Sequence, residues 1–379
     1  MKVLVYGSGQ LAQMMYLAAA PLGVSVQAVD VNTESVVNPL DKSILDISLN
    51  DAITQADALT VEFEHVPEHL LKHASNSGKL YPNIDSILAG ADRVREKALL
   101  QAYGIANCEH EIIRTVQQLD GITERLGERI IFKASRDGYD GYGQWRLTSK
   151  SQLQALIKEF QALDLDKVPL VAEKMLAFDR EISLIGSRNK QGQIRCFSIA
   201  ENLHHEGQLH VSVAPATQID ESLQTQANEI FTKLSEAMDY VGVLAVELFQ
   251  CGETLLVNEI APRVHNSGHW TQQGCHTSQF QQHIRAVLGL PLGSVGTYGV
   301  SAMVNIIGCD DIDNGLLGLD NTHLHLYGKT VRAKRKMGHI NVVADSHQNL
   351  GASLLALTKF LPMTHFPQLN EEAKRLKNS

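Results

Sequence analysis

A glycine-rich segment that directly follows an apolar strand constrains the fold of this chain more than any other feature. The segment, residues 130–146, reads IIFKASRDGYDGYGQWR. Residues 130–132 predict a buried strand that delivers one cation, Lys133, and strand-like residues resume at Gln144. Because glycines lack a Cβ, the N–H groups of such a loop can converge on an anion, and the lysine supplies the charge that a polyphosphate needs. Short glycine patterns also occur in ordinary hairpin turns, so the segment alone leaves both interpretations open.

Two other apolar strands, predicted at residues 241–249 and 254–260, each carry one carboxylate. A turn joins them into a hairpin, so Glu247 and Glu259 can lie opposite or diagonal to each other on one face. A buried carboxylate is costly unless it is paired or bound to a metal. Oxygen ligands on adjacent strands, with Asn258 beside them, are what Mg²⁺ bridging phosphates requires. The spacing favours this Mg²⁺ site over the alternative, two residues that face solvent on an edge hairpin.

The loop after this hairpin holds a cluster of hydrogen-bond donors that includes Arg263, His265, Asn266 and His269. An arginine fork with histidine and amide donors can bind a small oxyanion, and the adjacent metal site strengthens that interpretation. A zinc site at His265 and His269 is disfavoured, because the flanking proline and glycine oppose the helix that would align them.

The chain begins with the pattern of a βαβ unit. Residues 2–6 predict a buried parallel strand, and a GSGQ turn leads into a helix. Because Ala12 replaces the third glycine of the dinucleotide fingerprint, a plain α/β unit or a loop that lines a substrate pocket is favoured over a nicotinamide site. The strand at residues 57–63 ends near Glu62 and Glu64. Ligands collect at such strand ends, so these carboxylates are pocket candidates, with exposed loop residues as the alternative.

Three later segments carry candidate ligand contacts. Residues 169–174 predict a strand whose extended end offers backbone N–H and C=O groups to an adenine edge. Glu181 lies at the mouth of the next strand, and residues 202–205 are predicted to lie in a turn region. The basic run at residues 329–336 is either a solvated face or a grip for a phosphate monoester, and the sequence leaves both open.

Bulk properties exclude several classes of protein. At 379 residues the chain predicts two or three domains. No apolar run approaches the ~20 residues that span a bilayer, and the first strand starts at once, which predicts no signal peptide. Five dispersed cysteines without a CxxC pair indicate neither a disulfide framework nor a zinc site, and so predict a cytoplasmic protein. A net charge of −9 argues against nucleic-acid binding but allows an anionic small substrate in a local basic pocket.

Taken together, these segments resemble the ATP-grasp superfamily and, within it, the family of 5-(carboxyamino)imidazole ribonucleotide synthetases of purine biosynthesis. The motifs that carry the resemblance span nearly the whole chain: GSGQL, EFEHVP, ADRVREK, FKASRDGYDGYGQW, VNEIAPRVHNSGHWT and RKMGHIN. The resemblance implies an α/β and α+β chain with an ATP-grasp fold. Its expected parts are an N-terminal Rossmann-like domain of the biotin-carboxylase type (1–97), an ATP-grasp domain (98–295) whose lid subdomain (98–176) carries the glycine-rich loop (138–144), and a small β-rich C-terminal domain (296–379).

The same resemblance implies an activity. ATP, bicarbonate and 5-aminoimidazole ribonucleotide would give the N-carboxylated ribonucleotide, ADP and phosphate through carboxyphosphate. ATP and Mg²⁺ are the implied cofactors, and a homodimer is the implied assembly.

Site residues also follow from the family pattern. The implied ATP contacts are Arg93, Lys133, Gly138, Tyr139, Asp140, Gly141, Tyr142, Gly143, Gln144, Glu173, Lys174, Met175, Leu176, Glu181, His204, Asn258 and Glu259. The implied Mg²⁺ ligands are Glu247 and Glu259. Bicarbonate and carboxyphosphate would be seated by Arg263, His265 and Asn266. The implied contacts of the ribonucleotide are Glu64 (or Glu62), Tyr139, Asp140, Lys329, Arg335 and Lys336, with Asp140 as the hypothetical general base.

Two positions depart from the family pattern. The loop commonly reads GYDGRGQ, and Tyr142 replaces its arginine here, which removes one cation near the reacting anions. The family's SQFEQH reads SQFQQH here, so Gln281 replaces an acid. Neither change touches the metal pair or Lys133.

Three alternative functions remain possible on the sequence alone. A formate-using glycinamide ribonucleotide transformylase shares the architecture but differs in its acyl donor. A nicotinamide-dependent oxidoreductase is suggested only by the N-terminal GxG. A non-catalytic nucleotide sensor is the third, and the intact pair Glu247 and Glu259 argues against it.

Overall fold

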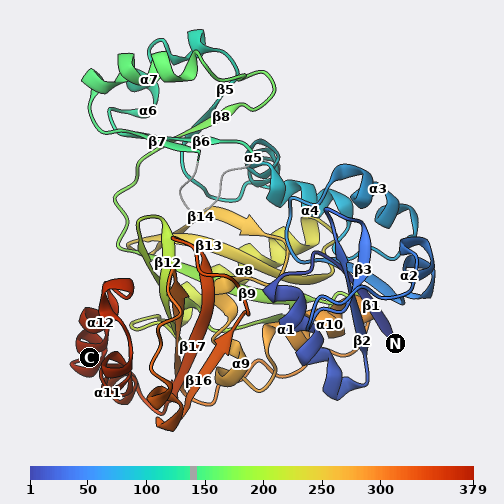
Figure 1. The fold of residues 1–379 in the computed structure, drawn as a ribbon. Helices are drawn as coiled ribbons and strands as arrows, with labels where there is room; N and C mark the ends of the chain where they lie inside the picture. The colour runs from blue at the N-terminus through green and yellow to red at the C-terminus, as the bar shows by residue number, and fades with distance from the viewer. Residues whose placement is uncertain (137–142) are drawn as a thin grey trace.

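The computed structural model describes residues 1–136 and 143–379, and Figure 1 shows how they are arranged. An N-terminal α/β unit and a long central sheet form the body of the molecule. A smaller lobe stands above the end of the central sheet where β13 and β14 lie. No helix among the described residues combines the length and the apolar character that crossing a membrane requires.

The N-terminal unit is built on a four-stranded sheet with the order β3-β2-β1-β4. Strands β1 (Lys2–Tyr6), β2 (Ser25–Asp30) and β4 (Ala58–Val61) are parallel, and β3 (Ser35–Val37) pairs antiparallel at the edge. Helices α1 (Gln10–Ala19), α2 (Leu49–Gln55), α3 (Glu68–Asn76) and α4 (Ile84–Ala91) accompany the sheet. Successive residues of β1 enter different hydrophobic clusters, so both faces of this sheet are covered, as in other parallel sheets. The predicted Rossmann-like fold is confirmed.

The N-terminus of α1 is capped from within the protein. The carboxylate of Glu62 accepts hydrogen bonds from the N–H groups of Gly9 and Leu11, the latter at 3.1 Å. A Cβ on Gly9 would lie 2.2 Å from a Glu62 carboxylate oxygen, which explains why glycine is needed here. Since the amides that would hold a pyrophosphate are already bonded to a buried carboxylate, this geometry argues against a nicotinamide site.

The central sheet has nine strands. Its order is β14 (Thr254–Ala261), β13 (Gly242–Cys251), β9 (Arg180–Arg188), β11 (Ala200–His205), β12 (Gln208–Ala214), β15 (Val300–Ile307), β17 (Lys336–Ala344) and β16 (Thr322–Leu326), and β10 (Ile194–Cys196) pairs with β9. Helices α8 (Glu221–Ala237), α9 (Thr271–Gly274), α10 (Gln279–Leu288), α11 (His347–Leu357) and α12 (Leu369–Lys377) accompany it. The predicted β-rich C-terminal region therefore extends the central sheet through the β12–β15 pairing.

The upper lobe has its own sheet, with the order β5 (His110–Ile113), β8 (Leu170–Lys174), β6 (Ile130–Ala134) and β7 (Gln144–Leu147). Helices α6 (Ile122–Leu126) and α7 (Leu153–Phe160) contribute to its separate core, in which the rings of Phe132 and Phe160 meet edge to face at 5.1 Å. Helix α5 (Arg93–Ala102) connects the lobe to the N-terminal unit. The predicted strand that carries Lys133 is confirmed as β6.

One predicted element has different boundaries. Residues 202–205 were expected in a turn region but lie in β11, and the chain turns at Glu206 and Gly207 instead. The backbone of residues 200–205 pairs with both β9 and β12, and this pairing outweighs their mixed composition.

Gln281, which replaces the acid found in the family pattern, lies in the first turn of helix α10. Ser278 is the N-cap of this helix, and its hydroxyl accepts the N–H of Gln281 at 3.2 Å. Position 281 is therefore the third position of the helix, where an acid could complete a capping box and would interact favourably with the helix dipole. We expect Gln281→Glu to raise the free energy of unfolding by about 0.3–1 kcal/mol in urea titrations at low salt. The gain should shrink at about 1 M salt, and a loss of stability would contradict this account.

Candidate active site

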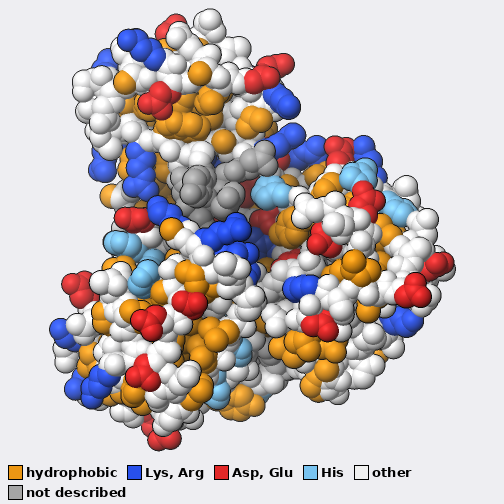
Figure 2. All heavy atoms as spheres, viewed as in Figure 1, with side chains coloured by type: hydrophobic (Ala, Val, Ile, Leu, Met, Phe, Trp, Pro, Cys, Tyr) orange, Lys and Arg blue, Asp and Glu red, His pale blue; other side chains and the backbone are white. Residues whose placement is uncertain are grey.

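A cavity of about 1410 Å³ lies where the upper lobe, the N-terminal unit and the central sheet meet. Figure 2 shows this hollow below the upper lobe, with Lys and Arg side chains gathered inside it. Most predicted site residues line it: Glu64, Arg93, Lys133, Gln144, Glu173, Lys174, Met175, Leu176, Glu181, His204, Glu247, Asn258, Glu259, Arg263, His265, Asn266, Arg335 and Lys336. Predicted residues Gly138, Tyr139, Asp140, Gly141 and Tyr142 lie outside the described residues.

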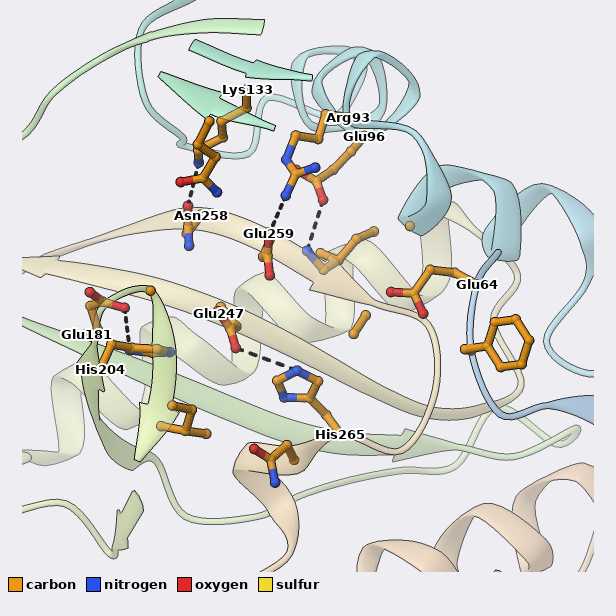
Figure 3. Close-up of a pocket in the computed structure, with 18 of the residues that line it drawn as sticks. Glu64, Arg93, Glu96, Lys133, Glu181, His204, Glu247, Asn258, Glu259 and His265 are labelled. Atoms are coloured by element: carbon orange, nitrogen blue, oxygen red, sulfur yellow. Dashed lines mark hydrogen bonds and ion pairs between the residues drawn. The ribbon is translucent and has the colours of Figure 1, made fainter. Parts of the chain in front are cut away.

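The two strand carboxylates lie opposite each other. Glu247 on β13 pairs in register with Glu259 on β14, so both side chains lie on the face of the sheet below the upper lobe (Figure 3). Burial raises the pKa of Glu247 to about 7, and the neighbouring Glu259 adds to this shift. Two carboxylates held side by side in a partly buried site favour a cation between them.

The donor set suits Mg²⁺. Among the described residues, no group of three or more His, Cys, Asp or Glu side chains could hold a metal by itself. Mg²⁺ commonly takes one or two carboxylates and completes its coordination with phosphate oxygens and water. Glu247 and Glu259 are therefore the residues that would hold it.

Lys133 is fixed from two sides. Its Nζ lies 2.6 Å from a carboxylate oxygen of Glu173 and 3.3 Å from Oδ1 of Asn258, on the strand of Glu259. The second oxygen of Glu173 lies 2.8 Å from Nζ of Lys97. Burial alone would raise the pKa of Glu173, but Lys133 and Lys97 outweigh it and lower the pKa to about 2. The carboxylate is therefore ionised, and Lys97 is a site residue that the sequence did not reveal.

Helix α5 begins at the cavity and carries a second cation. Nη2 of Arg93 lies 3.4 Å from Glu259, and the backbone N–H of Arg93 donates to the carbonyl of Ser135, directly after β6. Asp92 caps the helix and pairs with Arg136 at 2.7 Å. Arg93 thus faces the predicted metal pair, and Arg136 is a further cation beside the loop that the sequence analysis did not single out.

Gly143 adjoins the loop on its other side. It adopts a left-handed φ of 66° and its carbonyl accepts the N–H of Ala134, so β6 and β7 are joined here. This position favours glycine, which fits both interpretations of the segment, the phosphate loop and the hairpin turn.

Glu181 and His204 form a pair on adjacent strands. Nδ1 of His204 lies 2.8 Å from the Glu181 carboxylate. Burial would lower the pKa of His204, but Glu181 and Glu247 outweigh it, so the pKa lies above its ordinary value. The pair presents an acceptor and a donor to the cavity, which suits recognition of sugar hydroxyls.

Arg263 and Glu64 bridge two parts of the chain. The guanidinium donates to both carboxylate oxygens, with Nη2 to Oε1 at 3.0 Å. Burial would raise the pKa of Glu64, yet the Arg263 charge lowers it, so the pair is ionised. Arg263, a predicted bicarbonate contact, is therefore ion-paired with Glu64, a predicted ribonucleotide contact.

The other two predicted bicarbonate contacts have defined partners. Burial and the Arg263 charge hold the pKa of His265 well below its ordinary value, so the ring is neutral. Nδ1 of His265 accepts the N–H of Ser267 at 3.3 Å, which leaves Nε2 to carry the proton, 3.7 Å from Glu247. The amide of Asn266 exchanges hydrogen bonds of 3.0 and 2.7 Å with Asn305.

The basic run lies at the edge of the cavity. Arg335 and Lys336 line it, whereas Lys329 is not among the described lining residues. Nζ of Lys329 lies 5.4 Å from the ring centre of Tyr327. Burial lowers the pKa of Lys329 to about 8, and Arg335 contributes to the shift. The clustering is consistent with an anion site, one of the two interpretations of this run.

Glu96 makes the unfolding free energy of the protein depend on pH. Its buried carboxylate accepts the N–H of Ile260 at 3.0 Å, and burial raises its pKa from 4.5 to about 7. Between these two values the unfolded chain releases the proton while the folded protein keeps it, so this group lowers stability as pH rises. Glutamine at position 96 keeps an acceptor but does not titrate. We expect the difference in unfolding free energy, Glu96→Gln minus wild type, to increase by about 2 kcal/mol from pH 5 to pH 8.

Urea titrations at the two pH values measure this difference. Exposed Glu128→Gln, in the upper lobe, is the matched control and should give a difference that stays flat over this range. A flat difference for Glu96→Gln as well would contradict the assigned pKa.

Comparisons with known proteins agree with this geometry. Residues 1–89 match the ribonucleotide synthetase preATP-grasp domain, residues 98–280 match the ATP-grasp domain, and residues 301–353 match the phosphoribosylaminoimidazole carboxylase C-terminal domain. The N5-carboxyaminoimidazole ribonucleotide synthase of Vibrio parahaemolyticus is 47% identical, with 99% of each chain covered. The Escherichia coli protein of that name is 35% identical, with 95% of each chain covered.

Solved structures give the same result. The crystal structure of the Thermus thermophilus N5-carboxyaminoimidazole ribonucleotide synthetase matches with a TM-score of 0.86 and 36% identity, covering 95% of this chain and 98% of that one. An Aspergillus clavatus N5-carboxyaminoimidazole synthase in complex with ADP and 5-aminoimidazole ribonucleotide matches with a TM-score of 0.81 and 28% identity, covering 99% and 98%. The chain therefore belongs to the N5-carboxyaminoimidazole ribonucleotide synthase family of ATP-grasp enzymes.

Proposed function

We propose that this protein uses ATP and bicarbonate to carboxylate 5-aminoimidazole ribonucleotide, with Mg²⁺ bound between Glu247 and Glu259. The observation that carries the proposal is this opposed pair beside Lys133, in a chain that shares 47% of its residues with a named synthase. Mg²⁺, when bound, would neutralise charge on the β- and γ-phosphates of ATP.

The first step joins bicarbonate to the γ-phosphorus. A bicarbonate oxygen forms a bond to phosphorus, the bond to the ADP oxygen breaks, and ADP leaves. Lys133 and Arg93 would stabilise the phosphates, and Glu181 with His204 would hold the ribose hydroxyls. The guanidinium N–H groups of Arg263 that Glu64 does not use, together with the protonated Nε2 of the neutral His265, would donate to bicarbonate and to the carboxyphosphate that forms.

The second step transfers the carboxyl group. The exocyclic amine of the ribonucleotide bonds to the carboxyl carbon, phosphate departs, and the amine loses a proton. Asp140 stays our predicted base for that proton. Glu64, Lys329, Arg335 and Lys336 stay the predicted contacts of the ribonucleotide, the three cations at its phosphate. Exclusion of water from the cavity would protect carboxyphosphate from hydrolysis.

The experiment is an ADP-release assay in which substrates are omitted one at a time. We expect full turnover only with ATP, Mg²⁺, bicarbonate and 5-aminoimidazole ribonucleotide together, and none when formate and glycinamide ribonucleotide replace the last two. Turnover with formate would favour the transformylase instead. The homodimer and the cytoplasmic location also stay predictions, and sedimentation of the purified protein tests the first.

A further inference from the structure

Two lysines share one buried carboxylate at the wall of the cavity. Lys97 on α5, Glu173 on β8 and Lys133 on β6 are only 1%, 2% and 7% exposed. One carboxylate oxygen lies 2.8 Å from Nζ of Lys97, and the other lies 2.6 Å from Nζ of Lys133. Glu173 and Lys133 line the cavity, whereas Lys97 is not among its described lining residues. Lys97 is thus a buried cation that approaches the phosphate-binding lysine only through the carboxylate between them.

The second lysine matters because an isolated ion pair between Lys133 and Glu173 would leave Lys133 unable to attract a phosphate. A carboxylate at 2.6 Å would cancel most of the lysine's field toward a phosphate. Any movement of Lys133 toward a phosphate would also leave Glu173 buried without a partner, which is strongly unfavourable. The second cation removes both problems: the three side chains carry a net charge of one positive unit, and Glu173 keeps a partner when Lys133 turns to its ligand.

The groups around the three side chains bear on the idea that Lys97 pairs with Glu173 while Lys133 faces the ligand. Glu96, adjacent to Lys97 in sequence, has its carboxylate bonded to the N–H of Ile260, and its charge adds to that of Glu173 in raising the pKa of Lys97. The Cys108 thiol beside the trio has a pKa raised by burial, so it is neutral. The amide oxygen of Asn258 accepts from Lys133 on the cavity side.

We propose that Lys97 is a positioning residue for ATP: it neutralises Glu173 so that Lys133 directs its charge at the triphosphate. This inference rests on the proposed function, because it assumes that ATP occupies the cavity. The competing account is that Lys97 only satisfies a buried carboxylate during folding.

The test is calorimetric titration with ADP in the presence of MgCl₂. We expect Lys97→Met to weaken ADP binding by about tenfold or more and to raise the KM for ATP, while the KM for 5-aminoimidazole ribonucleotide changes less than about twofold. The double variant Lys97→Met/Glu173→Gln restores the net charge of one around Lys133. Adding Lys97→Met to Glu173→Gln should change ADP affinity by less than about threefold relative to Glu173→Gln alone, because no carboxylate is then left for Lys97 to neutralise. Lys150→Met/Glu124→Gln removes an exposed pair from the same lobe and serves as the matched control.

The outcomes separate the proposals. Wild-type protein that does not bind ADP would overturn the proposed function itself. Wild-type binding with an unchanged Lys97→Met, or an equally large loss of affinity when Lys97→Met is added to Glu173→Gln, would overturn the positioning role alone. If Lys97→Met does not fold, the comparison of the double variant with Glu173→Gln decides, because neither contains a buried carboxylate without a partner and Lys133 keeps the amide oxygen of Asn258 in both.

Discussion

Replacing Glu259 with glutamine should lower kcat by about 100-fold or more, the loss typical when a preorganised charge stabiliser is removed. Glutamine has nearly the shape of glutamate, so β14 and its pairing with β13 should persist. The change removes one of the two opposed carboxylates, and with it one of the two charges that would hold Mg²⁺. It also removes the negative charge that lies 3.4 Å from Nη2 of Arg93. The measurement is ADP release at saturating ATP, bicarbonate and ribonucleotide.

Glu253→Gln is the matched control, because Glu253 is exposed at the turn of the same hairpin. It should leave kcat within about twofold of wild type. Thermal unfolding without Mg²⁺ should show Glu259→Gln to be at least as stable as wild type, since a repulsion between two neighbouring, partly exposed carboxylates is relieved. Turnover within about fivefold of wild type would show that Glu259 is not a metal ligand.

Local pattern predicted much of this fold. The strand of Lys133 and the hairpin of Glu247 and Glu259 were correctly placed, because unbroken apolar runs of this length with intervening turn residues have few alternatives. Residues 115–126 show a limit of local pattern, because they carry helical periodicity but do not form one helix. They are divided into a 3₁₀ helix (Val116–Leu119) and α6, because Gly121 adopts a left-handed φ of 68°. Periodicity alone does not register such a break.

Long-range pairing was beyond the sequence. The chain gives no local sign that β12 pairs with β15, whose strand begins more than eighty residues later, so the C-terminal strands were not expected to extend the central sheet. The two carboxylates near the end of β4 show the same limit. Glu62 caps α1 and Glu64 pairs with Arg263, roles that only the folded arrangement distinguishes.

The sequence allowed a site residue to be predicted where a single charged residue lies within an apolar strand. Lys133, Glu247 and Glu259 each interrupt a hydrophobic strand. Lys97 lies in the mixed-charge stretch RVREK, where a lysine is ordinarily a surface residue. Its burial depends on Glu173, on a strand more than seventy positions away, so its part in the site followed only from the structure. The assignment of substrates came from the family resemblance, and the comparisons confirmed that family.

Replacing Lys133 with alanine should lower kcat/KM for ATP by about 100-fold or more, because a preorganised cation at the phosphates is lost. The protein should still fold, since Glu173 keeps Lys97 as its partner. The KM for 5-aminoimidazole ribonucleotide should stay within about twofold of wild type, because Lys133 is not among the predicted contacts of that substrate. Initial rates with each substrate varied in turn measure both quantities. Lys150→Ala, which removes an exposed cation from the same lobe, should change neither. A loss confined to the ribonucleotide KM, with kcat/KM for ATP intact, would show that Lys133 does not act on the triphosphate.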